Sequence, residues 1–301
     1  MHVALIGYGE VGQILAEELR AGGHVVSAYD LLLSGPCEAL REHARRHDVQ
    51  LAPSHHAAVN GAALVICAVT ARQTVEAARC CAGGLAEGAF FLDFNSASPG
   101  AKVAAAHLVA GGAGRYVEGA VMTAVPPHRL RVPLLLGGPH AAPLAPLLNR
   151  LGFMPRVFSR ELGVASATKM CRSVMIKGLE AMVIESMTAA RHYGVEDAVL
   201  ASLQETFPEI DWEHQATYFF QRVIEHGRRR AEEMHEAAAT VREAGLDPWS
   251  AEATAARQDW MASLAEAGTF GPRADAGFAR SANWRLEADR LLQHARSAGE
   301  S

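Results

Sequence analysis

The chain has 301 residues, enough for two domains of ordinary size and for a well-buried core. Half of the residues are hydrophobic and 20% are charged, a composition typical of globular proteins and unlike that of disordered chains. The 28 basic residues are balanced by 33 acidic ones, so no sequence-wide basic field favours nucleic acid or anionic lipid. We therefore expect a small-molecule substrate.

Cysteine and histidine usage gives little indication of bridges or metals. The five cysteines form an odd set without a CxxC spacing, which indicates reduced thiols. The fourteen histidines show neither HxH nor HExxH spacing, so we expect no metal. No apolar run is long enough to cross a membrane, and the first strand leads directly into a glycine motif, which argues against a signal peptide. These features predict a cytoplasmic protein.

The first half of the chain alternates short apolar segments with amphipathic ones. Strands are predicted at 2–6, 24–29, 64–69, 90–94 and 132–136, and helices at 11–21, 73–81 and 101–109. Strands that are apolar throughout are typical of a parallel sheet covered by helices on both faces. The pattern predicts an α/β fold: a doubly wound Rossmann domain.

The second half is predicted to be helical. Residues 164–192 contain no proline and one glycine, which favours a single long helix. Further helices are predicted at 195–203, 212–244, 250–267 and 282–298, with breakers between them. We expect Met175, Met182 and Met187 to lie in a helix core. The boundary is placed so that 1–162 form the Rossmann domain and 163–301 an all-α domain.

A GxGxxG motif joins the first strand to the first helix. Its residues are Gly7, Tyr8, Gly9, Glu10, Val11 and Gly12. The first glycine permits a tight turn, the second lets the backbone approach a pyrophosphate, and the third permits close helix–strand packing. The strand–turn–helix context therefore predicts a bound dinucleotide.

Asp30 closes the second strand and predicts which dinucleotide is bound. An acid at this place accepts hydrogen bonds from the adenine ribose hydroxyls and repels a 2′-phosphate. Leu31 and Leu32 follow it, so the segment offers no arginine for such a phosphate. We expect NAD in preference to NADP.

Polar residues follow the strand at 90–94. Asn95 and Ser96 lie where open α/β sheets bind ligands, and are predicted to contact the substrate. Ser98 precedes Pro99 and suits a helix N-cap, a role that would explain the pair by itself. Both interpretations stay open at this point.

Lys169 and Ser173 lie four residues apart near the start of the long helix and therefore share a face. An ammonium beside a carbonyl can polarise it and exchange a proton with the alkoxide. A solvated lysine on an amphipathic helix is the alternative. Lys177, two turns away, is expected to tolerate alanine.

The three motifs, in this order, resemble those of the β-hydroxyacid dehydrogenases, the superfamily of 3-hydroxyisobutyrate and 6-phosphogluconate dehydrogenases. The family's Asp-x-Ser-Thr-x-x-Pro segment is similar to 93–99, and its Gly-x-Gly-x-x-x-Lys-x-x-x-Asn helix to 163–173. The resemblance implies a catalytic Lys169, Val69 and Thr70 beside the nicotinamide, and Ser173 at the substrate. It also implies hydride transfer between nicotinamide and a secondary alcohol or its ketone, with a carboxylate nearby.

Three features of the sequence depart from the family pattern. Ala165 replaces the second glycine of the lysine motif and Ser173 replaces the asparagine. The family's carboxylate-binding Ser-Gly-Gly turn falls at 122–124, where Thr123 is the residue left to contact substrate. These departures leave two alternatives to the dehydrogenase: a dinucleotide-binding redox sensor without turnover, and an imine-reducing enzyme.

Two basic segments and the helical half complete the expectations. Arg228, Arg229 and Arg230 could face substrate or form a solvated face paired with Glu232 and Glu233. A second segment could cover the site or form a surface loop; it contains His128, Arg129 and Arg131. The long helix and those after it offer more apolar surface than a monomer would cover, which predicts a homodimer.

Overall fold

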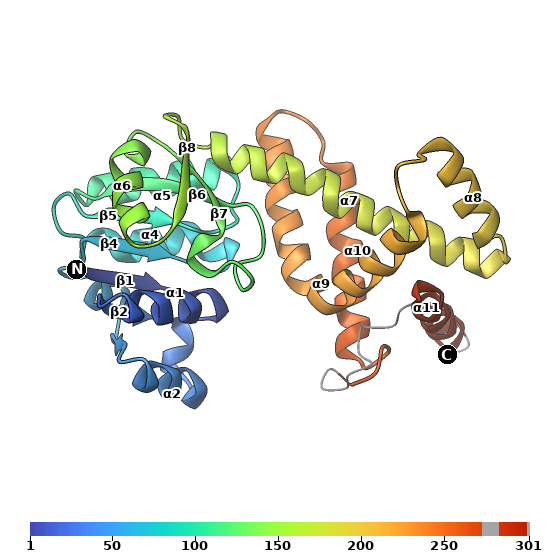
Figure 1. Cartoon of the computed structure of the whole chain (residues 1–301), viewed down its shortest axis with the longest axis horizontal. Coiled ribbons are helices and arrows are strands. Elements are labelled where there is room, and N and C mark those ends of the chain that lie inside the picture. The colour runs from blue at the N-terminus through green and yellow to red at the C-terminus, as the bar shows by residue number, and fades with distance from the viewer. Residues whose placement is uncertain (273–282, 300–301) are drawn as a thin grey trace. The chain divides into compact units, whose positions relative to one another are not determined.

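The computed structural model describes residues 1–272 and 283–299. The chain divides into two compact units, Met1–Cys171 and Arg172–Ser301. The division falls inside the long helix α7 (Val164–Tyr193), about two turns beyond its start. Figure 1 shows a sheet covered by helices in the first unit and helices alone in the second.

One sheet of eight strands forms the centre of the first unit, in the order β3-β2-β1-β4-β5-β6-β7-β8. The strands are β1 (His2–Ile6), β2 (Val25–Tyr29), β3 (Gln50–Leu51), β4 (Leu64–Cys67), β5 (Phe90–Asp93), β6 (Arg115–Val121), β7 (Pro133–Gly137) and β8 (Met154–Ser159). The Rossmann-type α/β class is confirmed. The sequence pattern predicts five of these strands and misses β3, β6 and β8, because the first is very short and the others carry charged or exposed residues.

The sheet is not parallel throughout, which corrects the expectation of a parallel sheet. β7 runs antiparallel to β6, with Ala120 opposite Leu135, whereas β8 runs parallel to β7. The segment between β6 and β7 contains no crossover helix and is at the lower limit of about a dozen residues that a parallel connection needs. The other neighbouring strands run parallel, so the carboxyl ends of β1, β4 and β5 share one edge.

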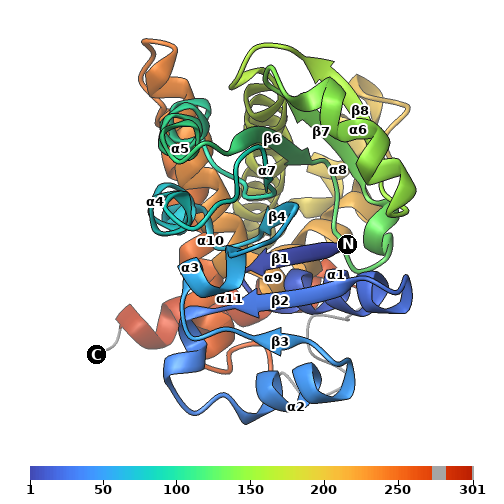
Figure 2. The ribbon, with the colours of Figure 1, turned by 90° about the vertical axis from the view of Figure 1, so that its left-hand side faces the viewer.

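Helices cover both faces of this sheet, as Figure 2 shows. They are α1 (Glu10–Ala21), α2 (Glu38–Arg46), α3 (His55–Val59), α4 (Thr74–Ala82), α5 (Pro99–Gly111) and α6 (Ala141–Arg150), with short 3₁₀ turns η1 (Leu31–Ser34), η2 (Ala71–Gln73) and η3 (Arg129–Arg131). Helices α1, α2 and α6 contribute to the core on one face, and α3, α4 and α5 to the core on the other. This is the doubly wound arrangement that the apolar strands predict.

The second unit is helical throughout its described residues. After α7 come α8 (Glu196–Thr206), α9 (Trp212–Glu243), α10 (Trp249–Glu266) and α11 (Trp284–Gly299). Its core packs aromatic and aliphatic side chains from all five helices, including the fully buried Phe220 and Trp284. The predicted start of the last helix, Ala282, lies outside the described residues. Among the helices described, none is long and apolar enough to cross a membrane.

The methionines of α7 do not all point inward. Met187 is buried, as expected, but Met175 and Met182 are 74% and 62% exposed. The expectation that they line the core is therefore wrong. The helix buries Glu180, Val183 and Ile184 instead, and the methionines follow each other at a seven-residue spacing on an exposed face.

Candidate functional site

The glycine loop leaves no room for side chains at two of its three glycines. Gly7 has φ +93°, and a Cβ there would lie 2.3 Å from the Ala68 carbonyl oxygen. A Cβ on Gly12 would lie 2.2 Å from the Gly7 oxygen, whereas Gly9 faces open space. No side chain caps the start of α1 in the structure, so its first backbone N–H groups can face an anion. The loop therefore fits a dinucleotide pyrophosphate.

Asp30 is held at the carboxyl end of β2 by this loop. Its Oδ2 accepts a hydrogen bond from the Tyr8 backbone N at 2.7 Å, and its Oδ1 accepts one from Leu32 N at 2.9 Å. Leu31 and Leu32 beside it are exposed. Both leucines line a surface hollow of about 410 Å³, a volume within the roughly 300–1,000 Å³ range of ligand pockets. The other lining residues are Ser34, Gly35, Pro36, Cys37, Ala39 and Leu40.

The other residues of the motif differ in exposure. Tyr8 is fully buried and its hydroxyl lies 2.8 Å from His43 Nδ1. Burial raises the pKa of this phenol, with a smaller effect from the charge of Glu17, so it stays protonated. Glu10 is exposed in the first turn of α1 and Val11 is half-buried against the sheet core.

Asn95 joins the ends of two neighbouring strands. Its Oδ1 accepts a hydrogen bond from Val69 N at 2.7 Å, and its Nδ2 donates to Cys67 Sγ at 3.4 Å. Thr70 follows, exposed, at the start of η2. The buried amide of Asn95 thus fixes the segment after β4, and substrate contact by Asn95 stays a prediction.

Lys169 and Ser96 are brought together across 73 residues of sequence. Lys169 Nζ donates to Ser96 Oγ at 2.5 Å, and both side chains are half-buried. Ser98 caps α5 through its hydroxyl, which accepts from Ala101 N, so the expected N-cap is confirmed. The Lys169 ammonium therefore has a partner at the carboxyl end of β5, and its catalytic role stays a prediction.

A buried carboxylate that the sequence analysis misses holds the start of α7. Glu118 is fully buried on β6, and its two oxygens accept hydrogen bonds from Gly163 N at 2.7 Å and Ser166 N. A negative charge at a helix N-terminus satisfies unpaired N–H groups and the helix dipole. The sequence feature that could have predicted this buried carboxylate is a lone acid within the largely apolar segment 115–121. Glu118 thereby fixes the turn that precedes Lys169.

A second buried cluster stabilises the end of β5. Lys102 Nζ lies 2.8 Å from Asp93 Oδ1, and the Tyr116 hydroxyl donates to Asp93 Oδ2 at 2.6 Å. Burial raises the pKa of Tyr116 well above its usual value, with a further contribution from Asp93, so the phenol remains a donor. The strand end that leads to Ser96 is thus fixed by a paired charge.

Two predicted substrate residues are not seen in contact with Lys169. The Ser173 hydroxyl is buried and accepts a hydrogen bond from Lys177 Nζ at 3.1 Å, and Lys177 also pairs with Glu233 at 2.8 Å. Thr123 is exposed in the segment after β6. Substrate contact by either residue stays a prediction.

Two arginines of the segment 228–230 form ion pairs. Arg228 binds Asp259 and Glu266 of α10 rather than the expected neighbours on its own helix. Arg230 is buried against Glu180 of α7. The interpretation of Arg228–Arg230 as a solvated face is therefore wrong for Arg230.

Each half of the chain matches a known protein family. Residues 2–123 match the NAD-binding domain of 6-phosphogluconate dehydrogenase, and residues 190–261 match a domain of unknown function, DUF1932. A solved structure of a conserved hypothetical protein from Sinorhizobium meliloti is 36% identical, with 97% of this chain and 96% of that one covered and a TM-score of 0.77. The chain therefore belongs to the same family as this Sinorhizobium meliloti protein. Its N-terminal domain is an NAD(P)-binding domain.

Two further solved structures are similar to the present chain. One is a conserved protein described as structurally similar to 3-hydroxyacid dehydrogenases: it is 31% identical, covers 89% of this chain and 98% of its own, and has a TM-score of 0.70. The other is 3-hydroxyisobutyrate dehydrogenase from Mycobacterium tuberculosis with L-serine, at 16% identity, coverage of 96% and 98%, and a TM-score of 0.69. The second shows a shared fold. The resemblance to the 3-hydroxyisobutyrate dehydrogenase fold is thus confirmed.

Proposed function

We propose that this protein is an NAD(P)-dependent oxidoreductase that transfers a hydride between nicotinamide and a secondary alcohol or its ketone. The observation that carries the proposal is the contact of Lys169 with Ser96. It sets an ammonium beside the carboxyl end of β5, on the edge of the sheet where the glycine loop follows β1. Open α/β sheets bind their ligands along this edge.

The cofactor would be held by residues on the same edge. The loop glycines and the first N–H groups of α1 would face the pyrophosphate, Asp30 the adenine ribose, and Val69 and Thr70 the nicotinamide side. When bound, nicotinamide supplies or accepts the hydride at its C4. Asp30 supports the choice of NAD over NADP.

Lys169 would manage the proton of the reaction. Its ammonium donates to a carbonyl oxygen as that oxygen gains negative charge, and in the reverse direction its amine takes the alcohol proton. Ser96 accepts a hydrogen bond from Nζ and so aims it. Glu118 positions Lys169 indirectly, by fixing the start of α7. Asp93 positions Ser96 indirectly, by fixing the end of β5.

We propose a β-hydroxyacid as the substrate class. The M. tuberculosis neighbour is described with L-serine, a β-hydroxy acid, although the turn at 122–124 lacks the Ser-Gly-Gly of the family. Thr123, exposed after β6, is the hydroxyl that this turn could offer to a carboxylate.

The test is a screen for NADH and NADPH formation with β-hydroxyacids, amino alcohols and cyclic amines. Oxidation of one of the alcohols by the wild-type protein, and its loss in Lys169→Ala, are the expected results. Turnover of amines alone would favour the imine-reducing alternative. Tight NAD(H) binding with no turnover across the panel would favour a redox sensor and overturn the proposal.

A further inference from the structure

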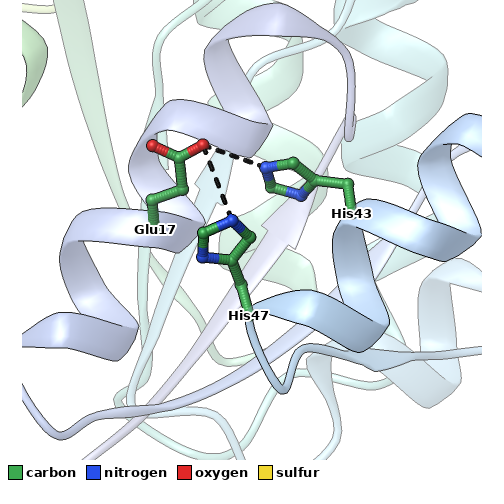
Figure 3. Close-up of side chains that lie close together, drawn as sticks. All are labelled: Glu17, His43 and His47. Carbon is green, nitrogen blue, oxygen red and sulfur yellow. Dashed lines mark hydrogen bonds and ion pairs between the residues drawn. The ribbon is translucent and has the colours of Figure 1, made fainter.

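Three potential metal ligands meet on the side of the Rossmann unit formed by α1 and α2. Figure 3 shows Glu17 from α1 facing His43 from α2 and His47 at the C-cap of that helix. Glu17 Oε1 lies 3.0 Å from His43 Nε2 and 3.9 Å from His47 Nε2, and the three ligand atoms are all within 4.8 Å of one another. The histidines are four residues apart, the second just after the last turn of α2, so both imidazoles lie on the same side of this helix end.

The partners behind these ligands already hold them in place. Glu17 Oε2 binds the Arg129 guanidinium, which leaves Oε1 directed at the imidazoles. The Tyr8 hydroxyl is hydrogen-bonded to Nδ1 of His43, the nitrogen that does not face Glu17. Arg20 donates a hydrogen bond to the backbone oxygen of His47. Metal-binding histidines and carboxylates carry outer partners of this kind.

Partial burial gives the cluster access to solvent without full hydration. The side chains of His43, His47 and Glu17 are 11%, 30% and 31% exposed. Glu17 and Glu18 both pair with the single Arg129, so the local charge of these three groups is negative by one. A cation can therefore reach the site and is attracted by it.

We propose that Glu17, His43 and His47 form a binding site for a divalent transition cation of the zinc class. Two imidazoles and one carboxylate suit Zn²⁺ rather than Mg²⁺ or Ca²⁺, which prefer oxygen ligands. Tetrahedral ligand atoms about 2.0–2.1 Å from zinc lie roughly 3.4 Å apart. The carboxylate oxygen lies 3.0 Å and 3.9 Å from the two imidazole nitrogens, and all three atoms lie within 4.8 Å of one another, so side-chain rotations bring them to zinc. The fourth position is left to water.

Occupancy of this site is linked to the glycine loop through one hydrogen bond. A metal on Nε2 of His43 requires the tautomer with a proton on Nδ1, which then donates to the Tyr8 oxygen. The Tyr8 oxygen lies 2.8 Å from this nitrogen, within reach to accept the bond. Since Tyr8 lies between Gly7 and Gly9, the cation stabilises the conformation of the loop, and this consequence rests on the proposed cofactor role.

The site is tested by titrating chelator-treated protein with Zn²⁺ in a calorimeter. We expect one equivalent to bind the wild type, with an affinity at least about tenfold weaker in His47→Gln because one of three ligands is lost. His107→Gln, an exposed histidine on α5, is the matched control and should bind as the wild type does. Equal zinc binding by wild type and His47→Gln, or none by the wild type, would overturn the site.

Cobalt separates this site from exposed thiols such as Cys80 and Cys171. Co²⁺ bound by nitrogen and oxygen gives visible d–d bands without the near-ultraviolet charge-transfer band of a thiolate complex. We expect the first spectrum in the wild type and its loss in His47→Gln. A thiolate band that persists in His47→Gln would assign the metal to cysteine and overturn the proposal.

The link to the loop has its own readout, the affinity for NADH with and without Zn²⁺. We expect tighter NADH binding with zinc, and no zinc effect in Tyr8→Phe, which lacks the hydroxyl but keeps the ring. An unchanged NADH affinity would overturn the link and leave the metal site standing. Zinc binding by a protein that does not bind NADH at all would instead overturn the proposed function.

Discussion

Lys169 is the residue on which the proposed chemistry depends. Its hydrogen bond to Ser96 holds the ammonium at the carboxyl edge of the sheet. We expect Lys169→Ala to lower kcat by about 10² to 10⁴, the usual contribution of general acid–base catalysis, with little change in NAD affinity. Single-turnover hydride transfer with the substrate found in the screen is the measurement.

Lys169→Arg provides the matched comparison. A guanidinium keeps the charge and can reach Ser96, but it stays protonated and cannot serve as the base, so the loss of rate should be almost as large. Rates near that of the wild type in both variants would remove Lys169 from the mechanism.

Lys177 is unsuitable as the neutral control that sequence suggests. Its ammonium is buried, pairs with Glu233 at 2.8 Å and donates to Ser173. Removing it leaves Glu233 without this partner, although Glu233 is partly exposed. We therefore expect Lys177→Ala to lower the free energy of unfolding by about 1–3 kcal/mol, measured by urea denaturation. An unchanged urea midpoint would contradict the importance of this pair.

Asp30 and Leu31 should control the choice of cofactor. The Asp30 carboxylate is fixed by Tyr8 N and Leu32 N, and Leu31 is exposed beside it. NAD(H) should bind at least about tenfold tighter than NADP(H), a difference of roughly 1.4 kcal/mol. The double variant Asp30→Ser/Leu31→Arg should narrow or reverse the gap. Equal affinities of the wild type in titration calorimetry would refute the preference.

At the scale of elements, the start of α7 depends on β6. Glu118 accepts hydrogen bonds from Gly163 N, just before α7, and from Ser166 N in its first turn, whereas a glutamine would set its own N–H₂ against one of them. We expect Glu118→Gln to cost about 1–3 kcal/mol and to increase hydrogen exchange at the Ser166 amide. The exposed Glu161→Gln is the control. Protection at Ser166 equal in both variants would count against the cap.

Element prediction succeeded where the periodicity was strong. The predicted helices at 164–192 and 212–244 match α7 and α9 closely because no proline interrupts either segment. β6 was missed because Glu118 and Arg115 disturb its apolar pattern, although Glu118 is buried there by its bonds to α7. β8 was missed because all of its side chains are at least partly exposed.

At the scale of the whole molecule, α7 carries an exposed apolar face. Met175 and Met182 lie seven residues apart on that helix, with Ile176 also exposed. Large exposed side chains on a helix favour self-association, so we retain the homodimer as a prediction. Light scattering should give about twice the 32.1 kDa chain mass. Met175→Glu/Met182→Glu should shift it to the monomer, and a monomeric wild type at micromolar concentration would refute the dimer.

The sequence by itself determined the class of the fold and the glycine loop, because both depend on local patterns: apolar periodicity, breakers, and backbone room that only glycine leaves. Tertiary structure decided which polar groups meet. Glu118 and the amides of α7 are some 45 residues apart, Lys169 and Ser96 are 73 apart, and Glu17 meets His43 26 residues later. Such contacts arise from packing of separate elements, and no local spacing records them.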